Sequence, residues 1–194
     1  LSTGMCKLSD IKDALDILVK KGTPKKNIEI LHCLSQYPAE EENLNLKSIR
    51  FIKDKLNLPV GFSDHSLGYD ASLIAIGLGA RVVEKHFTLN KKLVGPDHKI
   101  SLNPDELFQF IKKIRKAEKS LGNYIKKPHK DELINLKFIR KKIVAKKEIF
   151  IGDKFTSNNL TTKRSKNGLP ASSWKKILGK RAKKRFRLNE GVIN

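Results

Sequence analysis

The chain has 194 residues, 39% of them hydrophobic and 31% charged, which is the composition of a folded globular protein and excludes a disordered one. Its formal net charge is +21, but residues 1–100 carry only +3 (15 Lys and Arg against 12 Asp and Glu), whereas residues 101–194 carry +18 (26 against 8). These lysines are not interleaved with aromatic residues, so a solvated basic surface is favoured over a nucleic-acid-binding one, which is kept as an alternative.

In the first 121 residues, short apolar runs alternate with amphipathic stretches. The N-terminal stretch predicts a helix that begins at the cap Ser9 and ends near Gly22. The pattern then predicts strands and helices in alternation, with strands over 28–33, 58–64 and 80–87 and helices over 45–56, 70–79 and 103–121. This order implies parallel strands joined by crossover helices, so polar residues at the strand ends are candidates for an active site.

The composition changes after Leu121. Residues 122–134 are polar, include a proline and predict a linker, and residues 135–194 predict a small β-rich domain with short strands and one helix or turn. No apolar run approaches the ~20 residues that cross a bilayer, and the N-terminal residues do not resemble a signal peptide. We therefore expect a cytoplasmic protein with no membrane partner, in which both cysteines, Cys6 and Cys33, are buried thiols.

Two histidines fall at the ends of neighbouring predicted strands. Adjacent strands are ~4.8 Å apart, so the imidazoles of His65 and His86 could share one ion. Glu84 precedes His86 by two positions and points to the same face, and Asp64 adjoins His65. This set predicts either a divalent metal such as manganese, iron or zinc, or acid–base catalysis, against the alternative that each histidine is an ordinary core or rim residue.

Hydroxyl and carboxylate groups flank the same strand ends. Ser2, Ser35 and Ser63 stand at strand-to-helix turns, where hydroxyls and backbone amides can bind a phosphate, although each could equally be a capping residue. Asp97, in a Gly-Pro-Asp turn, could accept hydrogen bonds from a polyol or serve only as a turn residue. On the residues alone, both alternatives stay open in each case.

Several sequence stretches carry a resemblance to a known family. They are HCLSQYPA (32–39), GFSDHSLGYDAS (61–72), GARVVEKHFTLNK (79–91) and GPDHKISLNPDEL (95–107), preceded by STGM (2–5). Together they resemble the N-acetylneuraminate (sialic acid) synthase family, and the stretch IVAKKEIFIGDKFTSNNLTTKRSKNGLP resembles its C-terminal antifreeze-like (SAF) domain. Because the motifs occur in the family's order over nearly the whole chain, the resemblance is specific.

The resemblance implies a fold, a reaction and a set of site residues. The implied fold is α/β: a TIM (β/α)₈ barrel, of which 1–121 would be the C-terminal part, followed by an SAF domain at 135–194, in a domain-swapped homodimer. The implied reaction condenses phosphoenolpyruvate with an N-acetylmannosamine-type sugar and releases phosphate, assisted by Mn²⁺, with Mg²⁺ or Co²⁺ as alternatives. The implied residues are a catalytic Glu84, the metal ligands His65 and His86, the phosphoenolpyruvate-binding Ser2, Ser35 and Ser63, and the sugar-binding Tyr37, Asp97 and Arg164, the last lent to the partner's site.

Length separates this chain from the family pattern. A (β/α)₈ barrel typically needs ~250 residues, whereas residues 1–121 are all that precede the predicted linker. We therefore expect an N-terminally truncated fragment that is inactive alone, against the alternative of a non-catalytic remnant that acts as a dimerisation or interaction module. The sugar stays open between N-acetylmannosamine and a bacillosamine-derived precursor of legionaminic acid, while GPDHKISL resembles the pseudaminic-acid branch less.

Overall fold

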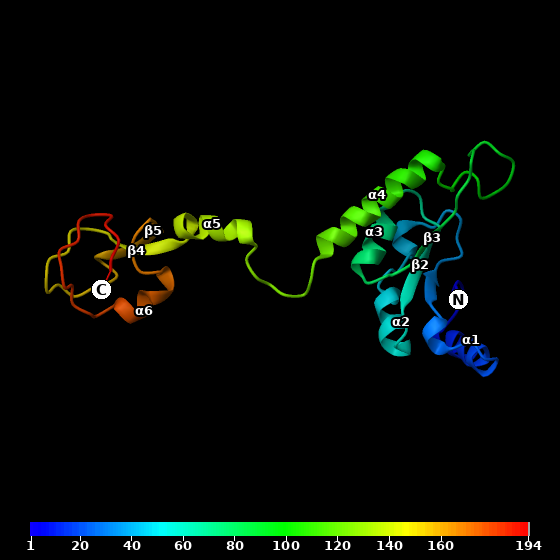
Figure 1. Ribbon diagram of the computed structural model, residues 1–194, viewed down its shortest axis with the longest axis horizontal. Coiled ribbons are helices and arrows are strands. Elements are labelled where there is room, and N and C mark those ends of the chain that lie inside the picture. The colour runs from blue at the N-terminus through cyan, green and yellow to red at the C-terminus, as the bar shows by residue number, and fades with distance from the viewer. Residues whose placement is uncertain (194) are drawn as a thin grey trace. The chain divides into compact units, whose positions relative to one another are not determined.

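The computed structural model describes residues 1–193, except for the side chain of Lys137. Two compact units divide the chain, the first spanning Leu1–Asn123 and the second beginning at Tyr124. This division falls inside the segment 122–134, which the sequence predicts as a linker. Figure 1 shows the first unit as an α/β arrangement and the second as a small unit with the strand pair β4 and β5.

The first unit is built on a parallel sheet. Its strands are β1 (Ile30–Cys33), β2 (Val60–Asp64) and β3 (Val83–Lys85), in the order β1-β2-β3. Single parallel bridges extend the sheet at its two edges and join Ser2 to Leu31 and Phe87 to Leu102. The parallel strands confirm the α/β architecture predicted from the alternation of apolar and amphipathic segments.

The strand predicted over 80–87 is too long, since β3 covers only Val83–Lys85. Beyond β3, the carbonyl of His86 accepts a hydrogen bond of 2.8 Å from the N–H of Leu102 instead of continuing the ladder with β2. This change of partner ends β3 and brings the far end of the loop 89–101 back to the sheet.

Helices follow the strands in the expected places. They are α1 (Leu8–Lys20), α2 (Ser48–Leu56), α3 (Asp70–Gly77) and α4 (Pro104–Leu121), with 3₁₀ turns at Lys25–Asn27 and Glu41–Asn43. The predicted cap Ser9 is wrong, because the carboxylate of Asp10 accepts the N–H of Lys7 at 2.8 Å and starts α1 earlier. Helix α4 begins as predicted, with Asn103 as its N-cap.

Helices α1, α2 and α3 pack on one face of the sheet. Ile30 of β1 and Val60 and Phe62 of β2 point to that face and are fully buried. The opposite face carries Gly61 and Ser63 of β2, with the side chains of Leu31 and Val82 beside Gly61. Gly61 is needed there, since a Cβ would lie 2.5 Å from Leu31 Cδ2 and 2.6 Å from the carbonyl oxygen of Val82. The core therefore lies on the helix-covered face, and Ser63 and Glu84 meet on the other face at the strand ends.

The second unit pairs β4 (Lys141–Ala145) with β5 (Leu160–Arg164) in antiparallel register. Its other elements are α5 (Lys130–Ile139), a 3₁₀ turn (Ala171–Ser173) and α6 (Trp174–Ile177). The buried core of this unit comprises Ile143, Ala145, Ile149, Phe155, Leu160, Ile177, Ala182, Phe186 and Val192. These features agree with the predicted small, β-rich SAF part.

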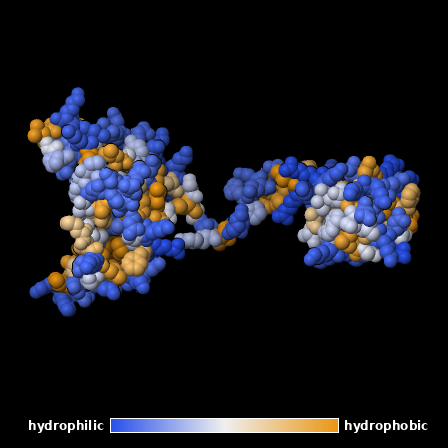
Figure 2. All heavy atoms as spheres, turned by 180° about the vertical axis from the view of Figure 1, so that it is seen from behind, coloured by the Kyte–Doolittle hydropathy of each residue, from blue (hydrophilic) through white to orange (hydrophobic). Residues whose placement is uncertain are grey.

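Helix α5 was not expected, because the sequence analysis placed 130–134 in a linker. Glu132 starts the helix by accepting the N–H of His129 at 2.7 Å, one half of a capping box. No described side chain of α5 is buried, and at least half of the surface is exposed at Leu133, Ile134, Phe138 and Ile139. Figure 2 shows apolar surface, in orange, on both units. Among residues 1–193, no helix combines the length and apolar character that crossing a bilayer requires.

Candidate active site

Strand register places a hydroxyl beside a carboxylate on the uncovered face of the sheet. Ser63 of β2 pairs with Glu84 of β3, and the Ser63 hydroxyl donates a hydrogen bond of 2.7 Å to Oε1 of Glu84. The same Oγ lies 3.4 Å from Nε2 of His65. Residues i and i+2 of a strand share a face. Ser63 and His65, at the end of β2, therefore lie on the same face as Glu84 and His86, at the end of β3.

The ring of His65 is held in one tautomer. Its Nδ1 lies 2.8 Å from the carbonyl oxygen of Leu34, and since a carbonyl oxygen can only accept, Nδ1 carries the proton. In the neutral ring Nε2 then keeps its lone pair, and it lies 3.4 Å from Oγ of Ser63, whose proton is donated to Glu84. A histidine that ligates a metal commonly donates its other ring nitrogen to a carbonyl in this way, so the geometry of His65 fits a ligand role.

Rings from three segments converge at this point. The ring centroids of His65 and His86 are 5.3 Å apart, with an interplanar angle of 55°. Tyr37, from the segment after β1, stacks on His65 at 4.1 Å and meets His86 edge-on at 5.7 Å. The N–H of Ala39 donates to the carbonyl of His65 at 2.9 Å, which ties that segment to the end of β2. The two histidines thus lie close enough to face a common ligand.

A cavity of about 140 Å³ opens beside these rings, lined by Ser63, His65, Glu84, Lys85 and His86. Within residues 1–193, no three His, Cys, Asp or Glu side chains are grouped so that they could hold a metal ion. An ion in this cavity would therefore have two imidazole ligands and take the others from water or substrate oxygens. Such a mixed nitrogen and oxygen set suits a borderline divalent ion.

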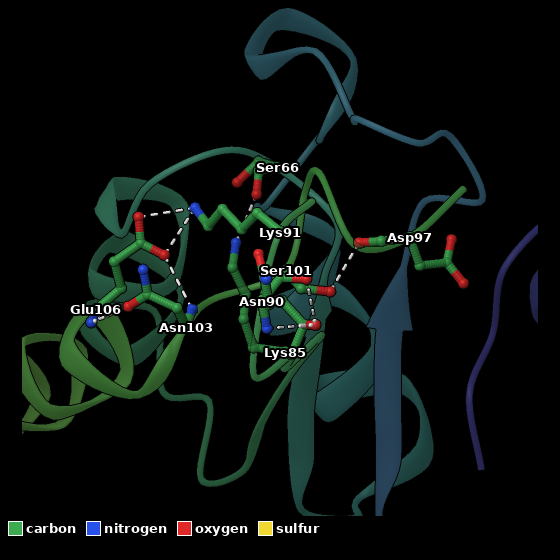
Figure 3. Close-up of polar contacts among 9 residues, drawn as sticks. Ser66, Lys85, Asn90, Lys91, Asp97, Ser101, Asn103 and Glu106 are labelled. Atoms are coloured by element: carbon green, nitrogen blue, oxygen red, sulfur yellow. Dashed lines mark hydrogen bonds and ion pairs between the residues drawn. The ribbon is translucent and has the colours of Figure 1, made fainter. Parts of the chain in front are cut away.

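Acidic groups surround Tyr37. Burial, and then the charges of Cys33, Asp97 and Glu84, raise the pKa of Tyr37, so its hydroxyl is a hydrogen-bond donor at neutral pH. The carbonyl of Asp97 accepts hydrogen bonds from the N–H of Ser101 at 3.1 Å and from its hydroxyl at 2.7 Å. The carboxylate of Asp97 is exposed and points away from the other labelled residues in Figure 3. The backbone of Asp97 is thus fixed while its carboxylate is left at the surface.

The loop 89–101, which carries Asp97, is anchored to the first unit. Lys91 forms an ion pair with Glu106 of α4, with Nζ 2.7 Å from Oε2 (Figure 3). The hydrogen bond from Lys91, followed by that from the backbone of Asn103, lowers the pKa of Glu106. Next to β3, Oγ1 of Thr88 lies 2.8 Å from Nδ1 of His98. These contacts hold the loop at both of its ends.

The remaining predicted site residues are exposed. The backbone of Ser2 bridges to Leu31 of β1. A Cβ at Gly4 would lie 2.2 Å from Oγ of Ser35, so Ser35 lies against the turn that follows Ser2. Arg164 ends β5 in the second unit, so it is not among the groups that the first unit brings together.

Asp64 and the cysteines differ from the sequence analysis. Asp64 lies on the helix-covered face, 1% exposed, with its carboxylate bonded to Lys85 rather than beside the ring of His65. Strand alternation could have predicted this. Cys6 is exposed, so the prediction of two buried thiols is wrong. Cys33 is half-buried, with Sγ 3.9 Å from Nδ1 of His65, and its register with Ser63 is the signal that could have placed it near the site.

Comparisons with known proteins match both units. The NeuB family model matches residues 1–126, and the SAF domain model matches residues 140–192. The N,N'-diacetyllegionaminic acid synthase of Campylobacter jejuni is 47% identical over 190 residues, which are 98% of this chain and 57% of that protein. The pseudaminic acid synthase of the same species is 33% identical over 192 residues, which are 99% of this chain and 55% of that protein.

Solved structures give the same result. The crystal structure of an N-acetylneuraminic acid (sialic acid) synthetase from Leptospira borgpetersenii superposes with a TM-score of 0.63 at 36% identity, covering 71% of this chain and 47% of that one. The chain therefore spans about half the length of the relatives that it matches.

Proposed function

The chain belongs to the NeuB family, with an SAF domain after its NeuB part, and from that premise we propose that its site serves nonulosonate synthesis. In the proposed reaction, phosphoenolpyruvate condenses with an N-acetylated amino sugar and phosphate is released. The observation that supports it is the convergence of His65 and His86 beside Glu84 on one cavity. Since the chain spans 57% of its Campylobacter relative, we propose this reaction for a protein that joins these residues to the remaining barrel strands.

We propose that His65 and His86 hold a divalent metal ion, Mn²⁺, with Mg²⁺ or Co²⁺ as alternatives. When bound, such an ion polarises the aldehyde of the open-chain sugar as a Lewis acid. The chain's own part is to present Nε2 of His65, because the carbonyl of Leu34 engages the other ring nitrogen. Tyr37, stacked on His65 at 4.1 Å, opposes rotation of that ring.

We assign proton handling to Glu84. The hydroxyl of Ser63 bonds to Oε1, which leaves Oε2 to accept a proton. Attack by the enol carbon of phosphoenolpyruvate on the aldehyde turns the aldehyde oxygen into a hydroxyl, which takes up one proton, and leaves positive character at C2. Water adds at C2 and gives up one proton, and phosphate leaves from the tetrahedral carbon as C2 becomes a ketone. A carboxylate beside that carbon can orient the water and take its proton.

We propose substrate-binding roles for the other candidates, namely phosphoenolpyruvate at Ser2, Ser35 and Ser63, and the sugar at Tyr37, Asp97 and Arg164. Ser63 would exchange its bond to Glu84 for one to the phosphate. Arg164 lies in the second compact unit of the chain, and we propose that it is supplied by the SAF domain of the partner in a domain-swapped homodimer.

For the sugar, we propose a bacillosamine-derived precursor of legionaminic acid ahead of N-acetylmannosamine. The identity of 47% to a legionaminic acid synthase, against 36% to a sialic acid synthetase, supports this order. We further propose that the reaction takes place in the cytoplasm.

Manganese binding by the 194-residue chain tests the site. Loss of a direct ligand should cost at least the ~10-fold in affinity that second-shell changes cost, so His65→Ala and His86→Ala should each weaken binding by that factor or more. His129→Ala, which removes an exposed histidine from the start of α5, is the matched control. Parent-like affinity in both site variants would reject the metal site.

Phosphate release from phosphoenolpyruvate tests the reaction. In the protein completed with the remaining barrel strands, release should require both the metal and one of the candidate sugars. A chain that dimerises but binds neither Mn²⁺ nor phosphoenolpyruvate would instead support a non-catalytic interaction module.

A further inference from the structure

A buried ion pair lies behind the two histidines. Asp64 of β2 and Lys85 of β3 are register partners, with Nζ 3.1 Å from Oδ2, and their side chains are 0% and 4% exposed. Burial lowers the pKa of Lys85, whereas the charge and hydrogen bond of Asp64 raise it. A buried ion pair is costly unless its remaining polar atoms are also bonded, and neither group has a role in the proposed reaction.

Both oxygens of Asp64 have further partners close by. Oδ1 accepts the N–H of Ser66 at 2.8 Å and its hydroxyl at 2.6 Å, and Oδ2 accepts the hydroxyl of Ser72 in α3. Lys85 also donates to the carbonyl of Ser66 (Figure 3). Ser66 is thus bonded through its N–H, its hydroxyl and its carbonyl, which fixes the turn after β2.

His65 stands between the two anchored residues Asp64 and Ser66, so the peptide planes on both of its sides are fixed. Rotation of its side chain is the freedom that is left, and the carbonyl of Leu34, 2.8 Å from Nδ1, selects one orientation. A shift of this turn by about 1 Å would take that contact out of hydrogen-bond range. Lys85 occupies the equivalent place in β3, between Glu84 and His86.

We propose that the Asp64–Lys85 pair is a positioning device, which fixes the orientation and tautomer of His65 and holds the strand that presents Glu84 and His86. Asp64 and Lys85 are positioning residues, because their charged groups are bonded to each other and to the two serines. The use of this geometry in metal binding rests on the proposed function, but the positioning itself is measurable without metal or substrate.

Two variants of the 194-residue chain test the proposal, Lys85→Met and the double variant Asp64→Asn/Lys85→Met. The double variant removes both charges at similar volume and so avoids leaving a buried, unpaired carboxylate. Nitrogen NMR of the imidazoles should show His65 only as the Nδ1–H tautomer in the parent, with a second, Nε2–H population in both variants. Lys91→Met, which breaks a half-exposed ion pair with Glu106, should leave the His65 signals unchanged.

Manganese titration of the same proteins separates positioning from function. Affinity should fall at least ~10-fold in the double variant, as for other second-shell changes. If the parent binds no Mn²⁺ but the variants mix tautomers, the positioning role is upheld and the proposed metal site fails. A double variant with unchanged circular dichroism and a single Nδ1–H tautomer would overturn the proposal. So would failure of both variants to fold, because the pair would then serve folding alone.

Discussion

Replacing Gly61 by alanine should destabilise the first unit. Gly61 is the second residue of β2, and a Cβ there would be 2.5 Å from Leu31 Cδ2 and 2.6 Å from the carbonyl oxygen of Val82. The leucine tip can rotate away. The carbonyl cannot, because it accepts the N–H of Phe62 at 2.8 Å in the ladder between β2 and β3. The added methyl group therefore forces the edge that carries Glu84 to move.

Overpacking of this kind costs ~1–3 kcal/mol, and the clash with a bonded backbone atom favours the upper end of that range. With a urea dependence of ~1–3 kcal/mol per molar, the midpoint of urea unfolding should fall by about 1 M. Far-UV circular dichroism and amide exchange in β1 and β2 would measure this unfolding. Gly77→Ala is the matched control, since no heavy atom lies within 4 Å of its Cβ position. Because Gly77 lies in helix α3, Gly77→Ala should leave the free energy of unfolding unchanged or raise it by up to ~1 kcal/mol. An unchanged midpoint for Gly61→Ala would refute the steric argument.

Three further predictions concern the same unit. Ser72→Ala removes a buried donor from Asp64 and should cost about 1–3 kcal/mol in urea unfolding; a loss near zero would mean that water replaces the hydroxyl. The pKa of Glu106 is lowered from 4.5, so the stability it contributes is present above that pH and lost as the pH falls through its folded pKa. Thermal melting of parent and Lys91→Met should therefore converge in acid, and a constant difference would contradict this. Exposed Cys6 should react with a thiol reagent faster than Cys33 in the folded chain, whereas equal rates would place both thiols at the surface.

The elements that the sequence predicts well are those set by local periodicity. The apolar runs of β1 and β2 and the amphipathic helices α2 and α4 appear where the pattern places them. The meeting of His65 and His86 was also predictable, because parallel neighbours end at one edge and residues two apart share a face. Strand alternation applied to Asp64 would have removed it from the predicted site as well.

Features that depend on the path of a loop were not predictable. Tyr37 reaches His65 because the segment after β1 folds back and Ala39 bonds to the carbonyl of His65, and no short-range pattern encodes that return. The end of β3 depends on Leu102, a partner 16 positions beyond His86. Helix α5 was missed because its start signal lies in a stretch whose composition is that of a linker.

In the segments 63–65 and 84–86, site residues alternate with the two members of a buried ion pair. Their outer residues, Ser63, His65, Glu84 and His86, line the cavity. Their central residues, Asp64 and Lys85, form a buried pair with each other, although Lys85 also borders the cavity. Slipping β3 by one residue would turn every side chain to the opposite face and would leave the buried carboxylate of Asp64 without its cation. Removing one partner of a buried pair costs ~3–5 kcal/mol, a large penalty for a strand of three residues. The ion pair thus disfavours the register in which Glu84 and His86 would point away from the cavity. Asp64 and Lys85 therefore help to specify the face on which Glu84 and His86 lie.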